Sequence, residues 1–218
     1  EVEEFKDQLN EVTSRLYGLE NLHSNFEGFQ EGVKQVMLWQ KQRVEQLHAD
    51  GSVSSFFQPV SEVVEVPSDY EVAMEAALGT RLQTLLSRDR DVAVVAVDYL
   101  KAQNSGRSSF LSDDSSTKQL SGNPSSEEGV TALLKDVVNY SENFSSAVSY
   151  MLDGIAVVDS IRTALKLRPQ YAGWTFVTQD GDTLTADGVM TGGSREGADS
   201  GVLKRRREIK ELSEKKQE

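Results

Sequence analysis

The sequence predicts an α/β globule with mixed α+β character, held between two coiled-coil helices. Three observations lead to this fold class: a heptad repeat at the start of the chain, a second heptad-like segment at its end, and short apolar strands that alternate with helices between them. The 218 residues, 38% of them hydrophobic, can form one or two ordinary cores. Because both ends stop within a helical pattern and there is no initiator Met, we expect a piece of a longer protein.

The N-terminal segment, residues 1–26, carries the clearest pattern. Apolar residues and one histidine recur at alternating steps of three and four, namely Val2, Phe5, Leu9, Val12, Leu16, Leu19, His23 and Phe26. At about 1.5 Å per residue, this helix would be roughly 40 Å long. Its narrow apolar stripe needs a partner helix to cover it.

The C-terminal segment, residues 198–218, is the natural partner. Its shorter repeat consists of Val202, Ile209, Leu212 and Lys216. We therefore expect the two segments to pair within one chain as antiparallel coiled-coil arms, with the globule at their tip. The alternative is two independent amphipathic helices that pack on the globule.

A first subdomain is expected over residues 27–103. A helix over 32–43 would bring four residues into one row, namely Val33, Val36, Met37 and Gln40. The stretch 91–103 fits either a buried strand or a helix, and its apolar spacing favours the helix.

Between those two helices, the sequence predicts a capped helix and a short strand. Ser68 would be the N-cap, with Glu71 three residues on, and Gly79 would end the helix. Residues 82–86 and 108–112 are predicted strands. The segment 104–129, in which nine of twenty-six residues are Ser, is expected to be a mobile linker.

A second subdomain is expected over residues 130–197. Helices are predicted over 130–134, 141–150 and 160–167, the last with Ser160 as N-cap, and a buried strand over 155–158. Residues 174–177 and 183–185 would form a hairpin around Asp180 and Gly181. A glycine-rich stretch, 187–197, follows.

Several classes of protein are disfavoured by composition. The absence of Cys excludes disulfides and thiolate zinc sites, and two histidines are too few for a histidine-based metal site. No apolar run approaches the roughly 20 residues of a membrane span. No phosphate-binding G-x-x-x-x-G-K-[ST] and no Ser/His/acid set near a G-x-S-x-G occurs. We therefore expect no cofactor and no catalytic residue, with a small α/β enzyme as the disfavoured alternative.

Three acidic residues in and after the predicted hairpin raise the question of a cation-binding loop. Asp180, Asp182 and Asp187 lack the remaining ligands of a calcium-binding loop, so we interpret them as turn formers and caps.

Charge is distributed unevenly. The net charge is −12, yet residues 202–218 hold seven Lys or Arg and four Glu, a balance of +3 that leaves −15 on the remainder. A local nucleic-acid contact is thus compatible with an acidic body. The alternative is a solvated helix face whose cations pair with Glu208 and Glu211.

Several segments resemble, in order, the hinge domain of SMC (structural maintenance of chromosomes) proteins. They are GFQEGVKQVM (28–37), VSEVVEVPSDYEVAMEAALG (60–79), GRSSFL (106–111), IAVVDSIRTAL (155–165) and FVTQDGDTLTADGVMTGGSREG (176–197). The style of the last segment resembles bacterial condensin-type members. No single segment is decisive, but the ordered set covers most of the chain.

The resemblance implies a homodimerisation hinge that joins two long arms of a chromosome condensation and segregation ATPase. Such a hinge would be cytoplasmic and nucleoid-associated, with ATPase heads and accessory condensin subunits elsewhere in the full-length protein. The implied dimer interface consists of Gly188, Met190, Thr191, Gly192 and Gly193. Glycine permits close backbone approach there, although a run of turns or a phosphate-binding loop are alternative interpretations.

The resemblance also implies weak, salt-sensitive DNA binding where the hinge meets the C-terminal arm. The candidate residues are Arg195, the one position that the resemblance carries over, and the basic run that follows it at the start of the C-terminal arm, Lys204, Arg205, Arg206 and Arg207. The sequence departs from the family at Asp187, which replaces a frequent glycine, and in the displacement of the basic cluster beyond Arg195. A nucleic-acid-binding module with incidental dimerisation is the alternative function.

Overall fold

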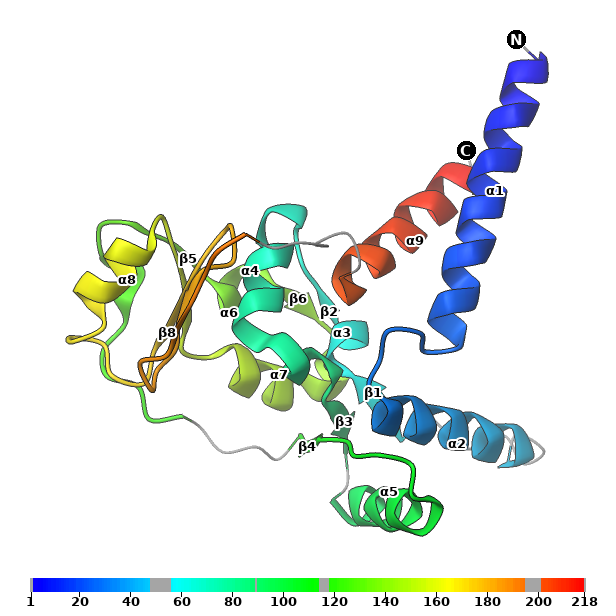
Figure 1. Ribbon diagram of the computed structural model, residues 1–218, viewed down its shortest axis with the longest axis horizontal. Helices are drawn as coiled ribbons and strands as arrows, with labels where there is room; N and C mark the ends of the chain where they lie inside the picture. Colours follow the sequence, from blue (N-terminus) through cyan, green and yellow to red (C-terminus); the bar gives the residue numbers. More distant parts are fainter. Residues whose placement is uncertain (1, 48–55, 89, 114–117, 195–200, 218) are drawn as a thin grey trace.

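The computed structural model describes residues 2–47, 56–88, 90–113, 118–194 and 201–217. Figure 1 shows a globule from which two terminal helices, α1 (Val2–Ser24) and α9 (Val202–Gln217), project on the same side. Between them, the described residues form three sheets and the helices that cover them. The expected α/β class is confirmed.

The first half of the chain contains a three-stranded sheet. Its strands are β1 (Phe57–Pro59), β3 (Leu85–Ser87) and β4 (Phe110–Ser112), in the order β1-β3-β4. β1 is antiparallel to β3, and β3 is parallel to β4. Helices α2 (Glu31–Leu47) and α5 (Arg90–Gln103) share a buried cluster with this sheet.

The chain between β1 and β3 contains the helix α4 (Ser68–Leu78). It is preceded by α3 (Val60–Val63) and β2 (Val64–Glu65) and followed by a 3-10 helix over Gly79–Gln83. The Gly79 backbone has a positive φ of 52°, which favours glycine and ends α4 where the sequence predicts.

The second half contains a five-stranded sheet in the order β10-β9-β8-β7-β5. Its strands are β5 (Val130–Leu133), β7 (Ile155–Val158), β8 (Thr175–Thr178), β9 (Thr183–Leu184) and β10 (Met190–Thr191). Only β7 and β8 run parallel. The remaining elements are α6 (Leu134–Val137), β6 (Asn139–Tyr140), α7 (Ser145–Leu152), α8 (Ile161–Leu167) and 3-10 helices over Pro124–Ser126 and Glu142–Phe144.

The main hydrophobic core joins the two halves. It combines Met74 and Leu78 of α4 with Leu134, Phe144 and Leu152 from the second half. The two-stranded sheet also crosses between them, because Val64 of β2 pairs with Tyr140 of β6. This cluster therefore connects the two halves expected as subdomains, and each half also has a buried cluster of its own.

Several sequence expectations are confirmed in detail. Val33, Val36, Met37 and Gln40 are all buried on α2. The stretch 91–103 is helical, and Ser160 caps α8 by accepting a hydrogen bond from the Thr163 backbone N–H. The predicted hairpin is β8–β9.

Three local expectations are wrong. Residues 130–134 contain strand β5 instead of a helix, because hydrogen bonding to β7 offers this short β-branched stretch a partner. Ser68 is not the N-cap: Pro67 holds that place, and the Ser68 hydroxyl contacts Asp69. The strand expected at 82–86 starts only at Leu85, because the 3-10 helix occupies the residues before it.

The segment 104–129 is more structured than a linker where it is described. It contributes β4 to the first sheet and a 3-10 helix near its end. Lys118 anchors it to the second half by donating from Nζ to the carbonyl oxygens of Asp153 (2.7 Å) and Met151 (3.3 Å).

Candidate functional sites: an open sheet edge and the junction with the terminal helices

Strand β10 forms one edge of the five-stranded sheet. Met190 pairs with Leu184 and Thr191 with Thr183, and within the described residues no strand lies on the other side of β10. Val189 is 56% exposed and Met190 is 50% exposed. An edge with free backbone groups and large exposed apolar side chains is a surface on which a further strand can pair.

The turn that leads into β10 is tightly held. The backbone N–H groups of Thr185 and Gly188 donate to Val189 O (2.9 Å) and Thr185 O (2.8 Å). Asp187 accepts a hydrogen bond from the Thr185 hydroxyl, and this bond lowers the pKa of the Asp187 carboxyl. Asp187, where the family often has glycine, thus has a defined role in closing the turn.

The candidate interface glycines have different environments. A Cβ on Gly188 (φ +92°) would meet the Arg168 guanidinium, and one on Gly192 would meet the Asp182 carboxylate. Gly193 (φ +128°) faces open space among the described residues, while its N–H donates to Asp182 Oδ1 at 3.2 Å. Gly188 is therefore favoured by its positive φ and Gly192 by the close Asp182 side chain, whereas the Cβ position of Gly193 is open to a partner.

Two features of this edge escaped the sequence analysis. Asp182 is interpreted there only as a turn former, but it also holds the end of β10 through Gly193. Val189 lies in the segment 176–197 that resembles the family. A large apolar residue within a glycine-rich stretch was the signal that could have identified it.

A second surface with exposed apolar residues lies on the other sheet. β4 is an edge of the three-stranded sheet in the described part of the chain. Val94 and Val95 of α5, a helix that contacts β4, are both exposed. The described part of the molecule thus presents a second sheet edge at β4 and an exposed apolar pair on the helix that contacts this strand.

The terminal helices lie side by side and run in opposite directions (Figure 1). Arg15 of α1 forms an ion pair with Glu208 of α9. Leu16 is buried, but Leu9 on the same heptad stripe is 51% exposed. The pairing expected within one chain is therefore present near the globule, and the stripe on α1 continues beyond it.

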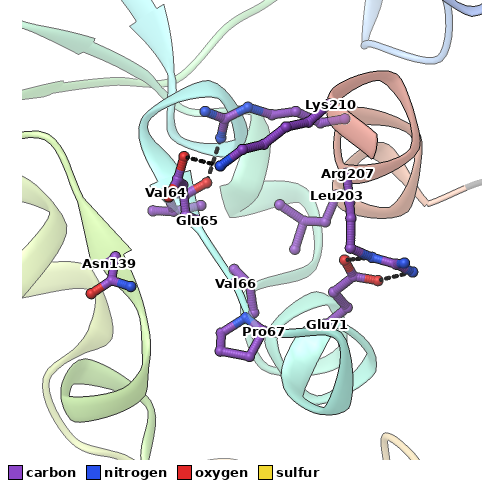
Figure 2. Close-up of a pocket in the computed structure, with 10 residues that line it drawn as sticks. Val64, Glu65, Val66, Pro67, Glu71, Asn139, Leu203, Arg207 and Lys210 are labelled. Carbon is purple, nitrogen blue, oxygen red and sulfur yellow. Dashed lines mark hydrogen bonds and ion pairs between the residues drawn. The ribbon is translucent and has the colours of Figure 1, made fainter. Parts of the chain in front are cut away.

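The basic run of α9 docks this helix on the globule. Arg205 donates to the carbonyl oxygen of Glu27, and Arg206 donates to those of Ser61 (2.9 Å) and Val64. Arg207 binds the buried carboxylate of Glu71 through two hydrogen bonds of 2.6 and 3.2 Å (Figure 2).

Arg207 also forms an ion pair with a residue of its own helix. Glu211 accepts a hydrogen bond from it at 2.9 Å, one helical turn away. The hydrogen bonds that Arg207 donates to Glu71, and then to Glu211, raise the pKa of Arg207 above its usual range. The expected pairing of Glu211 with a cation of its own helix is thus confirmed, whereas the partner of Glu208 is Arg15 of α1.

The candidate DNA-binding residues are only partly described. Arg195 lies outside the described residues. Lys204 is half-buried at the start of α9. The guanidinium groups of Arg205, Arg206 and Arg207 all bond within the chain, so DNA contact by these residues remains a prediction.

Histidine and acidic residues were also candidates for other roles. His23 lies 3.5 Å from the Glu62 carboxylate, at the junction of α1 with the globule. In the described parts of the chain, no three His, Cys, Asp or Glu side chains gather as metal ligands would. None of the helices described is both long and apolar enough to cross a membrane.

Comparisons with known proteins agree on one family. The family model for the SMC protein flexible hinge domain matches residues 53–168. The chromosome partition protein Smc of Myxococcus xanthus is 35% identical over 98% of this chain, and that of Bacillus subtilis 27% identical over 90%. The chain spans 17% and 16% of the length of these two relatives.

Solved structures give the same result. The chain is similar to a crystal structure of an asymmetric dimer of the Geobacillus stearothermophilus SMC hinge domain, with a TM-score of 0.77 and 26% identity over 97% of this chain and 83% of that one. A Pyrococcus furiosus Smc hinge domain with an extended coiled coil has the same fold, with a TM-score of 0.55 and 24% identity, covering 100% of this chain and 76% of that one. The chain belongs to the family of SMC hinge domains.

Proposed function

We propose that this chain is the homodimerisation hinge of a bacterial chromosome partition protein of the SMC type. The open edge at β10, with Val189 and Met190 exposed beside it, is the observation that carries the proposal. The dimeric state of the similar Geobacillus hinge domain supports it. The full-length protein would hydrolyse ATP in heads outside this chain, and would be cytoplasmic and nucleoid-associated.

A two-fold dimer can have one contact, in which β10 pairs with β10 of the partner, or two equivalent contacts, in which β10 of each copy meets a different surface of the other. We assign the second arrangement, with the edge at β4 as that surface, because β4 is an open edge of the other sheet in the described residues.

The proposed interface residues are Met190, Thr191, Gly193 and Val189, with Gly188 and Gly192 shaping the strand from within. Two sheet edges joined in this way would bury main-chain hydrogen-bonding groups that are otherwise exposed to water. The two terminal helices would leave each copy together and continue as its coiled-coil arm.

The test is the oligomeric state of a variant that changes the edge without changing the fold. Met190→Lys places a charge on an exposed strand position, so the chain should fold normally while a copy–copy contact there is repelled. Sedimentation equilibrium should give a dimer for the parent and a monomer for the variant, with Met190→Leu as the dimeric control. A monomeric parent at micromolar concentration, or a lysine variant that dimerises with unchanged affinity, would contradict the proposal.

Gly192→Glu is a poorer test, because its side chain would first collide with Asp182 of the same chain. Gly193→Glu avoids that collision but strains a backbone at φ +128°.

Weak DNA binding is the second candidate function. The favourable observation is the basic balance of residues 202–218 at the junction, in a chain that is otherwise acidic. Because Arg205, Arg206 and Arg207 already bond within the chain, we assign most of the contact to Arg195 and the exposed Lys215 and Lys216.

Fluorescence anisotropy with labelled DNA should show binding that falls steeply between low and near-physiological salt. A variant with Ala at Arg195, Lys215 and Lys216 should lose it. Equal binding by both proteins, or none by the parent at low salt, would leave dimerisation as the sole function of this chain.

A further inference from the structure

Lys118 holds the C-terminal end of helix α7. Its Nζ donates to the carbonyl oxygens of Asp153 (2.7 Å) and Met151 (3.3 Å) and lies 5.3 Å from the centroid of the Tyr150 ring. The side chain is half-buried there. Carbonyl oxygens at the end of a helix carry partial negative charge, which favours a cation. The charge of Lys118 therefore helps to hold the segment that follows it against the second half of the chain.

The other end of α7 is held by the same part of the chain. Asp113 Oδ1 accepts a hydrogen bond of 3.0 Å from the backbone N–H of Ala147, in the first turn of the helix. An anion at the start of a helix and a cation at its end both match the helix dipole. Loss of the charge on Lys118 would remove one of these two attachments.

Among the described residues, no carboxylate forms an ion pair with Lys118. The Asp153 carboxylate is instead bound by Lys135 at 3.0 Å. Arg81, in the 3-10 helix after α4, lies close enough to repel the charge of Lys118. Burial first, and then Arg81, lower the pKa of Lys118 to about 8, although the charge of Asp153 acts in the opposite direction. A part of this amine is therefore neutral near neutral pH, and a neutral amine is nucleophilic.

We propose that Lys118 is an acylation site, which takes the acyl group of a small acyl phosphate. The neutral Nζ would attack the acyl carbonyl carbon and form a C–N bond. The C–O bond to the phosphate would break, inorganic phosphate would leave, and the amine would release a proton to water. Arg81 would attract the phosphate group of the donor to this place.

Acylation would weaken the attachment of the segment that begins at Lys118. The amide product keeps one N–H and no charge, so it cannot donate to both carbonyl oxygens of α7 or balance the helix end. Two contacts farther along would lose this support. Leu120 lies against Gly154, and the Ser121 N–H donates to Ala172 O at 3.1 Å. The acyl group would thus loosen residues 118–122 from the second half.

The first experiment treats the 218-residue chain with acetyl phosphate at about pH 7.5 and follows each lysine by peptide mass spectrometry. At this pH about one quarter of Lys118 is neutral, against about one in a thousand for an ordinary lysine. Lys118 should therefore be acetylated at least about tenfold faster than the exposed Lys41 and Lys101. Lys34 should react more slowly still, because its hydrogen bond with Glu27 raises its pKa.

The dependence on pH and on Arg81 tests the cause. The rate at Lys118 should level off above about pH 8, whereas the rate at Lys101 should continue to rise. Arg81→Gln should slow the reaction at Lys118 by about two- to fivefold. Lys41→Gln removes one positive charge from α2 and should leave the rate at Lys118 unchanged. The preference for Lys118 over Lys101 should be stronger with acetyl phosphate than with an uncharged acetyl thioester, and an equal preference would overturn the assignment of an acyl phosphate as donor.

The second experiment measures the effect on the structure. Lys118→Gln imitates the neutral acylated side chain, and Lys118→Arg keeps the charge. Amide hydrogen exchange at Ser121 should be about fivefold faster in Lys118→Gln and in the acetylated chain, and close to that of the parent in Lys118→Arg. Thermal melts show whether each variant folds. Acetylation of Lys118 no faster than that of Lys41 and Lys101 would overturn the proposal, as would unchanged exchange at Ser121 in the acetylated chain.

Discussion

Arg207 of α9 and Glu71 of α4 form a two-point ion pair, with 2.6 Å between Arg207 Nε and Glu71 Oε1 and a second bond of 3.2 Å. Glu71 is one of the few charged residues that are buried. Removing the arginine would leave this carboxylate without its cation. The pair therefore connects the C-terminal helix to the main core.

Arg207→Gln is expected to lower the free energy of unfolding by about 1–2 kcal/mol, because the buried Glu71 carboxylate loses its charged partner. Arg207→Lys should recover only part of this loss, since an ammonium group cannot reproduce the two-point geometry. Urea denaturation measures the change, with Lys215→Gln as the control. A double-mutant cycle with Glu71→Gln should show strong coupling; additive losses would contradict the pairing.

Gly32 and Gly18 should respond in opposite ways to alanine. A Cβ on Gly32 would collide with the backbone of Arg107, so Gly32→Ala should cost about 1–3 kcal/mol. Gly18 lies on α1 with no described atom within 4 Å of its Cβ position, so Gly18→Ala should stabilise the helix by about 0.5–1 kcal/mol. Thermal denaturation of both variants tests the close approach of α2 to residues 106–107.

Ser160 and Ser68 distinguish a real helix cap from an apparent one. Ser160 accepts a hydrogen bond from the Thr163 N–H at 3.3 Å, so Ser160→Ala should destabilise the chain by about 1 kcal/mol. Ser68 makes no capping bond, so Ser68→Ala should have an effect within about 0.5 kcal/mol of zero. Equal losses in urea denaturation would show that the capping assignment is incorrect.

The turn before β10 should weaken in acid. The hydrogen bond from Thr185 lowers the pKa of Asp187 relative to the unfolded chain. Its stabilising contribution is therefore complete above the ordinary carboxyl range, near pH 4, and is lost as pH falls through the lowered value. Carboxyl ¹³C titration should give Asp187 a lower pKa than free aspartate. Thr185→Val should return it toward the ordinary value; an unchanged titration would rule out this bond as the cause.

A thiol crosslinker can test whether the terminal helices pair within one chain. The chain has no cysteine, so Arg15→Cys with Glu208→Cys introduces a single thiol pair, and a bismaleimide reagent can bridge the space that the two long side chains now span. The reagent should give a crosslinked monomer on denaturing electrophoresis, at every protein concentration. A crosslinked dimer would show instead that the helices pair between chains.

Local patterns predicted those parts of the fold that are determined by neighbours in sequence. The buried row of α2, the Ser160 cap and the β8–β9 hairpin all depend on residues a few positions apart. The Glu211 partner of Arg207 was predictable for the same reason, because it lies one helical turn away.

Long-range contacts account for what sequence alone did not predict. Glu71 lies 136 residues before Arg207, and the partners of Arg206 are 142 and 145 residues away, so spacing carries no sign of them. β2 and β6 have two residues each, too few to show a period. The four residues of β5 become a strand only because β7 lies beside them.

The shared core has a mechanical consequence. Tension transmitted along the terminal helices would enter through Leu203 and Arg207 of α9, which contact the core and α4. Because the cluster around α4 contains residues from both halves of the chain, a pull on α9 would act on both halves together.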